Sequence, residues 1–279
     1  MNKTKIEWVQ NPDGSQGYTW NPITGCLNGC DYCYARKLAN TRLRERYLAN
    51  KNIAIGNEYI NMSDTRDKYQ MVKFADDPFY PRFWPEKLLQ PYVKGKSKGI
   101  FVCDMSDLFG IGIPDLWTTE VLNAIRACPQ HRFYLLTKQP QNLAKFSPFP
   151  DNCWVGVSAT NNYTYLGELQ TIEAKVKYIS FEPLLNWRKF PAQKAQLDFI
   201  LQKLGVSWVI IGAQTKPTVM PEIEWVREIV QTCDKAGIPV FLKDNLEPLM
   251  GGYPIPKENI WAYKFDGGEF KLRQEMPTK

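Results

Sequence analysis

From residue 98 onward, short apolar runs alternate with longer amphipathic segments. The runs are rich in β-branched and aromatic residues, which predicts strands. They span residues 99–105, 132–138, 153–158, 176–182, 208–214 and 238–244. The segments between them predict helices, most clearly at 116–127 and at 221–236, where Gly237 follows as a helix stop. An earlier strand is expected at 18–20.

This alternation of strands and helices predicts an α/β fold with a parallel sheet and covering helices. The strands are nearly continuous in apolar character, as strands buried on both faces should be. About seven strands fit a partial or full TIM-type (β/α) barrel most easily, with a doubly wound open sheet as the alternative. We expect one barrel domain over residues 1–279. Residues 50–98, which include a stretch dense in proline and aromatic residues, are expected to be an insertion after the first βα unit that packs on the barrel.

Polar residues follow almost every predicted strand. In a parallel barrel the strand ends meet at the mouth where active sites form. Each such residue could instead be an ordinary cap or loop residue. Lys243, for example, is followed by Asp244, so the two could form a plain ion pair. The residues that follow predicted strands and become candidates are Asp104, Ser106, Asp107, Ser158, Asn161 and Glu182.

The composition excludes several classes of catalytic and metal site. The only histidine is His131, directly before a predicted strand, so Ser-His-Asp catalysis would rest on it alone and a zinc site built mainly on histidine is impossible. Seven cysteines without an apolar leader argue against a disulfide framework. No apolar run approaches the length of a membrane span, and we expect a cytoplasmic protein with no membrane partner. The net charge of +6 permits a polyanionic partner without requiring one.

Three cysteines, Cys26, Cys30 and Cys33, lie in one short glycine-containing segment with the spacing C-x3-C-x2-C. Three thiolates can hold three irons of a cubane cluster. Because no fourth cysteine lies at short spacing, one iron would keep an open position, as a catalytic metal site requires. Zinc held by these cysteines and a distant fourth ligand is an alternative, and so is a purely structural cluster. The segment follows the first predicted strand and precedes a predicted helix at 34–49.

The cysteine spacing, with the aromatic Tyr32 directly before Cys33, resembles the radical SAM superfamily. Further segments are similar to a phage and prokaryotic family of radical-SAM-like proteins of unknown function, and the similarity covers roughly residues 4–250. These segments are 20–26, 101–109, 135–138, 154–158, 180–184 and 241–243. That family often carries a Gly-Gly-Glu-Ser-Gly stretch after its sixth barrel strand. Here Gln214 stands in place of the acid, which removes a charge.

The resemblance implies a [4Fe–4S] cluster on Cys26, Cys30 and Cys33 and S-adenosylmethionine (SAM) across the strand ends. One-electron cleavage of SAM would give methionine and a 5′-deoxyadenosyl radical that abstracts a hydrogen atom from a substrate. An electron donor such as flavodoxin or ferredoxin is implied as a partner. The resemblance also suggests roles for the candidates: Asp104, Ser106 and Asp107 near the SAM amino group, Ser158 and Asn161 near ribose or carboxylate, Glu182 at its strand end, and Tyr32 beside the cluster or adenine.

The predicted helix after the cysteines is strongly basic, which would suit contacts with phosphates, although such a strip is usually a solvated helix face. The radical SAM superfamily includes enzymes that repair or modify DNA and RNA. We therefore place a nucleic-acid base or nucleotide first among substrate classes. The alternatives are a non-catalytic metal- or cluster-bearing protein that binds DNA or RNA, and a radical SAM enzyme acting on a peptide or a small metabolite.

Overall fold

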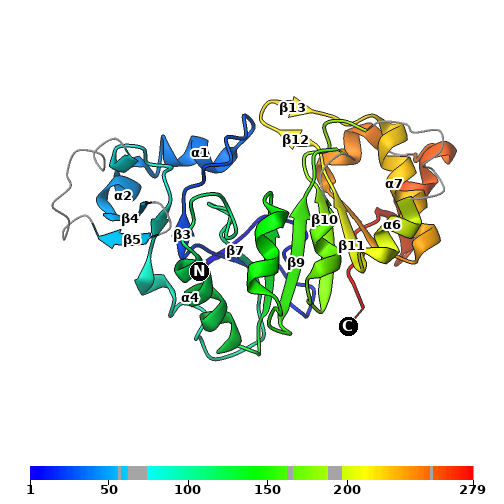
Figure 1. Cartoon of the computed structure of the whole chain (residues 1–279). Coiled ribbons are helices and arrows are strands. Elements are labelled where there is room, and N and C mark those ends of the chain that lie inside the picture. Colours follow the sequence, from blue (N-terminus) through cyan, green and yellow to red (C-terminus); the bar gives the residue numbers. More distant parts are fainter. Residues whose placement is uncertain (56–57, 62–73, 162–165, 188–196, 252–253, 279) are drawn as a thin grey trace. The chain divides into compact units, whose positions relative to one another are not determined.

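The computed structural model describes residues 1–55, 58–61, 74–161, 166–187, 197–251 and 254–278. Backbone contacts divide the chain into two compact units (Figure 1). The first comprises Met1–Trp154 and Glu173–Lys175, and the second comprises Val155–Ile172 and Val176–Lys279. The chain passes from one to the other within a single strand, β9 (Cys153–Ser158).

The first unit is built on a sheet with the strand order β1 (Asn2–Lys3), β2 (Tyr18–Trp20), β7 (Gly99–Val102) and β8 (Arg132–Thr137). β1 is antiparallel to β2, whereas β2, β7 and β8 are parallel, which confirms the predicted strands in these regions. All residues of β7 are buried, which explains their continuous apolar run. The strand ends at Val102, earlier than expected, because Cys103 takes a left-handed backbone conformation with φ of 60°.

The described part of the expected insertion, 50–98, forms a small antiparallel sheet with a strand that precedes it. The strand order is β3 (Ile23–Thr24), β6 (Arg82–Phe83), β4 (Asn52–Ile55) and β5 (Glu58–Asn61), and the 3₁₀ turn η1 (Pro85–Lys87) follows β6. The insertion is therefore tied to the strand that leads directly into the cysteine segment. Residues 56–57 and 62–73 lie outside the described part, and packing of the insertion on a barrel stays a prediction.

The segment after the cysteines contains two short helices, α1 (Tyr34–Ala39) and α2 (Arg44–Ala49), so the expectation of one continuous helix over 34–49 is wrong. The break has a local cause. The Asn40 Nδ2 donates to the Arg36 carbonyl at 2.8 Å, and the Thr41 hydroxyl donates to the Lys37 carbonyl at 2.8 Å. These side chains satisfy carbonyls at the end of α1 and so compete with continuation of the helix. The unit also contains α4 (Asp115–Arg126), close to its predicted bounds, and η2 (Pro140–Phe146).

The second unit carries the strand order β9, β10 (Val176–Phe181), β11 (Val206–Ile211) and β14 (Val240–Leu242). β10, β11 and β14 are parallel, and all four strands fall where apolar runs predict them. The helices are α5 (Glu168–Thr171), α6 (Leu197–Lys203) and α7 (Ile223–Ala236), and α6 lies beside α7 and β11 (Figure 1). Gly237 ends α7 with φ of 69°, as its position in the sequence predicts.

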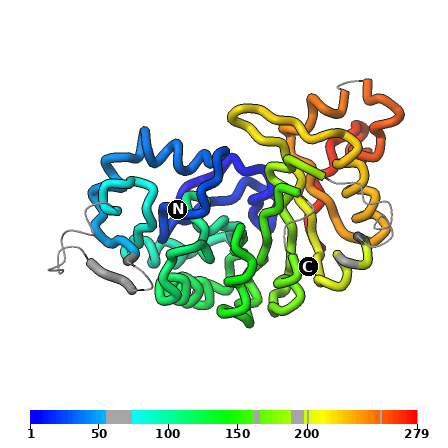
Figure 2. The backbone as a smooth tube through the Cα atoms, turned by 45° about the horizontal axis from the view of Figure 1, so that its top comes forward, coloured from blue at the N-terminus to red at the C-terminus, as the bar shows by residue number. Residues whose placement is uncertain are grey.

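Smaller elements complete the second unit. Two hairpins are formed by β12 (Gln214–Thr215) with β13 (Thr218–Val219) and by β15 (Tyr263–Asp266) with β16 (Glu269–Leu272). The first hairpin projects from its unit, as the yellow loop in Figure 2 shows. The 3₁₀ helices are η3 (Asp244–Met250) and η4 (Lys257–Ala262).

Residues 273–275 pair with the outer side of β14. The Leu242 amide donates to the Arg273 carbonyl at 2.7 Å, and the Glu275 amide donates to the Val240 carbonyl at 3.0 Å. The Trp208 indole donates to the Glu275 carbonyl at 2.8 Å. The segment is therefore held by backbone and side-chain bonds at once.

Among the described strands, the strand order ends at β1 in the first unit and at β14 in the second, and β1 and β14 do not pair with each other. A barrel requires the strand order to close. The fold is therefore α/β with extensive parallel pairing, and the described strands do not form the closed TIM-type barrel considered from the sequence. Within the described residues, no helix has the length and apolar character needed to cross a membrane.

Candidate functional site

The cysteine loop, defined here as residues 25–33, joins β3 to α1 in the first unit. Cys26, Cys30 and Cys33 are free thiols of intermediate burial, whereas the other four cysteines are buried. Cys33 caps α1, and its Sγ accepts a hydrogen bond from the Arg36 amide at 3.4 Å. The Cys26 Sγ accepts one from the Asn28 amide, also at 3.4 Å. Backbone amides thus already point at two of the three sulfurs.

Gly25 anchors the start of the loop. Its φ of 86° is a conformation that suits glycine, and a Cβ built on it would lie 2.4 Å from the Tyr80 carbonyl oxygen. The Gly25 amide donates to the Met105 carbonyl at 2.9 Å, and the Gly25 carbonyl accepts from the Ser106 hydroxyl at 2.5 Å. The loop therefore begins clamped between the turn at residue 80 and the segment that follows β7.

A buried arginine supports the other side of this clamp. The Cys26 amide donates to the Phe79 carbonyl at 2.9 Å, so the turn 75–80 holds the first cysteine directly. Arg82 is 0% exposed, and its guanidinium donates to four backbone carbonyls at 2.7–3.2 Å. These carbonyls belong to Asn50, Ala75, Asp77 and Tyr80. Arg82 therefore fixes the turn on which Cys26 rests.

Asp107 connects the middle of the loop to the segment after β8. Its carboxylate is 5% exposed and accepts four hydrogen bonds, at 2.7–3.1 Å, from the Asn28 amide group, the Thr137 hydroxyl and the backbone amides of Phe109 and Lys138. Asn28 in turn accepts from the Gln139 amide group at 2.9 Å. Asp107 and Ser106 thus support the loop, and contact of either with SAM stays a prediction.

Asp104 lies on the other flank of the loop. Its carboxylate accepts from the Asn21 amide group at 2.6 Å, and the Tyr34 hydroxyl donates to its backbone carbonyl at 2.6 Å. Burial raises the pKa of this carboxyl above its ordinary value, while the Asn21 and Tyr34 hydrogen bonds act in the opposite direction. Asp104 lies in a turn that begins at Cys103, whose φ is 60°. The Ser106 amide donates to the Cys103 carbonyl at 2.9 Å and closes this turn.

The Cys26 thiol lies close to the Asp107 carboxylate and to the other two thiols of the loop. Burial, then the Asp107 carboxylate, raises the pKa of the Cys26 thiol to about 12, with smaller contributions from Cys30 and Cys33. Burial and the nearby Cys30 likewise raise the pKa of Tyr32, whose ring lies 5.7 Å from the Lys138 ammonium. A bound metal reverses this balance, because a coordinating thiol is deprotonated outright. Loading of the loop would therefore release protons.

The donor set of the loop suits a cluster bound by three thiolates. Within the described residues, no group of three or more histidine, cysteine, aspartate or glutamate side chains stands ready-made to hold a metal ion. Cys30 and Cys33 are nevertheless near enough to Cys26 to raise its pKa, and the sulfurs of Cys26 and Cys33 accept backbone N–H bonds. Hydrogen bonds to the sulfurs are a feature of iron–sulfur sites. The three cysteines thus fit an iron–sulfur cluster chemically, and binding of the cluster would complete the alignment of their side chains.

The remaining candidates belong to the second unit. Ser158 ends β9 and is buried, and Asn161 donates to the Thr160 hydroxyl at 3.5 Å. Glu182, directly after β10, forms an ion pair with Lys243, directly after β14. Gly212 permits this pair, since a Cβ there would meet the Lys243 side chain at 2.9 Å. Their roles toward SAM stay predictions.

Three supporting residues were missed by reasoning from the sequence: Asn28, Arg82 and Gln139. Asn245 was expected only as one of the polar residues at the strand ends. Asn245 bonds the Ala213 amide and carbonyl at 3.1 and 2.9 Å, and so holds the segment after β11. Gln214, at the position where the resemblance predicts an acid, donates to the Pro217 carbonyl at 2.9 Å within the hairpin. The one available signal was position, because Gln139 and Asn245, like the candidates, follow predicted strands.

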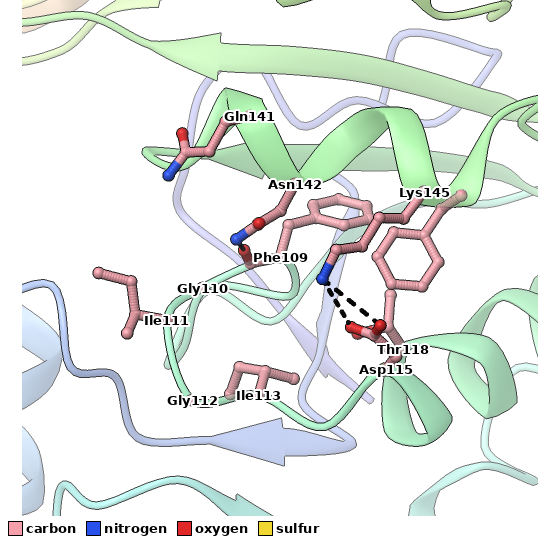
Figure 3. A pocket seen from close by; sticks show the side chains of 11 residues that line it. Phe109, Gly110, Ile111, Gly112, Ile113, Asp115, Thr118, Gln141, Asn142 and Lys145 are labelled. Atoms are coloured by element: carbon pink, nitrogen blue, oxygen red, sulfur yellow. Dashed lines mark hydrogen bonds and ion pairs between the residues drawn. The ribbon is translucent and has the colours of Figure 1, made fainter. Parts of the chain in front are cut away.

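A pocket of about 250 Å³ adjoins the cysteine loop in the first unit, between residues 109–118 and 141–146 (Figure 3). Its charged lining residues, Asp115 and Lys145, form an ion pair at 3.3 Å. A Cβ on Gly112, in the pocket wall, would meet the Leu27 side chain at 2.7 Å. The pocket wall therefore packs on the loop, although its charges are already paired with each other.

Comparison with known proteins gives a family but no activity. A family model described as "Protein of unknown function (DUF5131)" matches residues 3–252. No curated protein matches the chain.

Three solved structures of spore photoproduct lyase are similar to the chain. A single-site mutant has a TM-score of 0.47 and 12% identity, over 86% of this chain and 80% of that one. A complex with dinucleoside spore photoproduct has a TM-score of 0.42 and 13% identity, over 95% and 68% of the two chains. A double mutant with bound AdoMet and dinucleoside spore photoproduct has a TM-score of 0.42 and 14% identity, over 96% and 71%.

Proposed function

The chain belongs to the family described as "Protein of unknown function (DUF5131)", and we propose that it is a radical SAM enzyme that binds a [4Fe–4S] cluster through Cys26, Cys30 and Cys33. The observation that carries this proposal is the cysteine loop. It offers three thiols and no fourth, on a segment fixed at both ends. A metal site with an open position is suited to catalysis, whereas structural sites are usually closed.

When bound, the cluster supplies the electron that cleaves SAM to methionine and a 5′-deoxyadenosyl radical. The chain's own residues would hold the loop and orient the ligand. Asp104, beside the loop, has a carboxylate that can accept hydrogen bonds from the SAM amino group. Tyr32 and Tyr34 flank Cys33 and offer rings beside the cluster or adenine. Ser158, Asn161 and Glu182 are proposed as further residues that contact SAM.

We test the proposal by anaerobic reconstitution with iron and sulfide, followed by SAM and dithionite. Chromatography then measures 5′-deoxyadenosine. We expect product from the wild type and none from Cys30→Ala, whose cluster lacks a ligand. Cys128→Ala is the matched control, because Cys128 is a buried thiol remote in sequence from the loop and should leave SAM cleavage intact. A fully loaded wild type that neither binds nor cleaves SAM would refute the proposal.

For the substrate we favour a nucleic-acid base or nucleotide, and for the electron donor a small acidic redox protein such as flavodoxin or ferredoxin. Free cysteines throughout the chain suit a reducing compartment, and we propose a cytoplasmic enzyme. The competing candidate is a metal-bearing protein that binds nucleic acid without catalysis. That alternative predicts a loaded loop that forms no 5′-deoxyadenosine.

A further inference from the structure

Positive charge is concentrated directly after the cysteine loop. Residues 34–51 contain six lysines and arginines and one acid, Glu45, so they carry a net charge of +5. The whole chain carries +6. The rest of the sequence is therefore close to neutral, and the basic character of the protein is a property of α1, α2 and their flanks.

The two helices direct this charge outward. Their apolar face, with Ala35, Leu38, Ala39, Leu43 and Tyr47, packs in a cluster that also includes residues 79, 84 and 105 and the cysteines at 26 and 33. The opposite face carries exposed cations. We call this exposed set the cationic strip, and it consists of Lys37, Arg42, Arg44, Arg46 and Lys51.

Within the described residues, none of the five strip cations lies within 4.0 Å of a carboxylate. The nearby Arg36 differs, because it is turned toward the cysteine loop, donates to the Cys26 carbonyl at 3.1 Å and pairs with Asp77 at 3.8 Å. A solvated helix face usually mixes both signs of charge. An unmixed strip instead creates a local positive potential.

The positive region continues onto η1. The Lys87 ammonium lies 3.9 Å from the Trp84 ring centroid, and the Arg46 guanidinium lies 5.7 Å from the same centroid. Burial, followed by the charge of Arg46, lowers the pKa of Lys87 to about 8. The two cations therefore stand close together on one ring, where an added anion would relieve their repulsion.

We propose that the cationic strip binds the phosphate backbone of DNA or RNA and so delivers a polynucleotide to the cysteine loop. The delivery role rests on the proposed function, whereas the binding itself does not. Phosphates repeat along a polynucleotide, and the strip offers them several exposed cations on two successive helices and in the segments beside them. An anionic membrane fits less well, because surface-bound helices insert large apolar side chains. Tyr34, at the start of α1, is the one large apolar side chain exposed between residues 34 and 54, all of which the structure describes.

The test measures binding of a fluorescein-labelled 20-nucleotide oligomer, single-stranded or duplex, by anisotropy at 50–200 mM salt. Contact with five phosphates gives a slope of log K against log salt of about −4.5 on duplex DNA, or roughly a 500-fold loss of affinity over that range. The strip variant Arg42→Gln/Arg44→Gln/Lys51→Gln should make the slope shallower by about 2.7. The matched control, with the same loss of charge, replaces three exposed lysines outside residues 34–51 with glutamine: Lys94, Lys96 and Lys175.

We expect the control to bind as the wild type does. Equal binding by the strip variant and the control would overturn the proposal, as would an absence of wild-type binding. Strip-dependent binding to phosphatidylserine vesicles, but not to the oligomer, would also overturn it in favour of a membrane. SAM cleavage without oligomer is measured on all three proteins. SAM cleavage without oligomer binding would refute this inference alone. Strip-dependent binding of the oligomer without SAM cleavage would refute the proposed function alone.

Discussion

Replacing Arg82 with methionine should destabilise the protein and prevent loading of the cysteine loop. The guanidinium is fully buried and donates to four backbone carbonyls. Methionine has similar length and fills much of the same space, but it donates nothing. The turn 75–80 would lose the bonds that fix it, and with it the carbonyl of Phe79 that receives the Cys26 amide.

The size of the effect follows from those four carbonyls. Leaving a buried acceptor unsatisfied costs about 1–3 kcal/mol, and the bonds to Tyr80 and Ala75 are fully buried while the other two are partly so. Burial lowers the pKa of Arg82, which indicates that burying its charge is itself unfavourable, and methionine removes that cost. The net loss is about 4 kcal/mol, a large share of the roughly 5–15 kcal/mol that stabilises a typical domain.

Urea unfolding followed by tryptophan fluorescence measures this loss. With an m-value of about 3 kcal/mol/M, the midpoint should fall by about 1 M, and iron per chain after reconstitution should fall with it. The control is Arg126→Met, because Arg126 is exposed and bonds only the Asn123 side chain among the described residues, so its midpoint should stay within measurement error. A wild-type midpoint in the Arg82 variant would refute the supporting role given to this guanidinium.

Two further results are expected. Gly25→Ala places a methyl group 2.4 Å from the Tyr80 carbonyl oxygen at a φ of 86°, so reconstituted iron per chain should drop severalfold. Gly14→Ala, which has open space at a φ of 81°, is the control for backbone strain alone. Equal iron loading of the two variants would contradict the role given to Gly25 in anchoring the cysteine loop. The lowered pKa of Lys87, about 8 against an ordinary 10.5, means that the unfolded chain binds more protons between these values, so stability contributed by this group rises with pH over that window. Lys87→Met should lack that rise in urea titrations, and an identical pH profile would count against the burial of the ammonium.

The sequence predicted the parallel strands because strands buried on both faces are nearly continuous in apolar character, and β7 and β9 are fully buried. It could not predict β3 and β6, because two residues are too few to show any period. The break after α1 depended on side chains of Asn40 and Thr41 that helices also tolerate.

The candidate site was predictable only in its chemistry. Three cysteines at short spacing are visible in the sequence, but the residues that support them come from distant positions. Asn28 and Asp107 are 79 positions apart, and Trp84 bonds Thr24 from 60 positions away. Such pairings depend on how the strands are ordered in space, which local pattern does not encode.

The pairing of residues 273–275 with β14 has a consequence for where this protein can be cut. The match to the family ends at residue 252, yet the hydrogen-bonding edge of β14 is covered only by residues beyond that point among those described. A chain shortened to the matched region would expose an unpaired strand edge, and such edges are templates for addition of another chain. The folded structure therefore extends beyond the last residue matched by the family. A fragment that ended there would be expected to aggregate through the exposed edge of β14, which residues 273–275 cover in the longer chain.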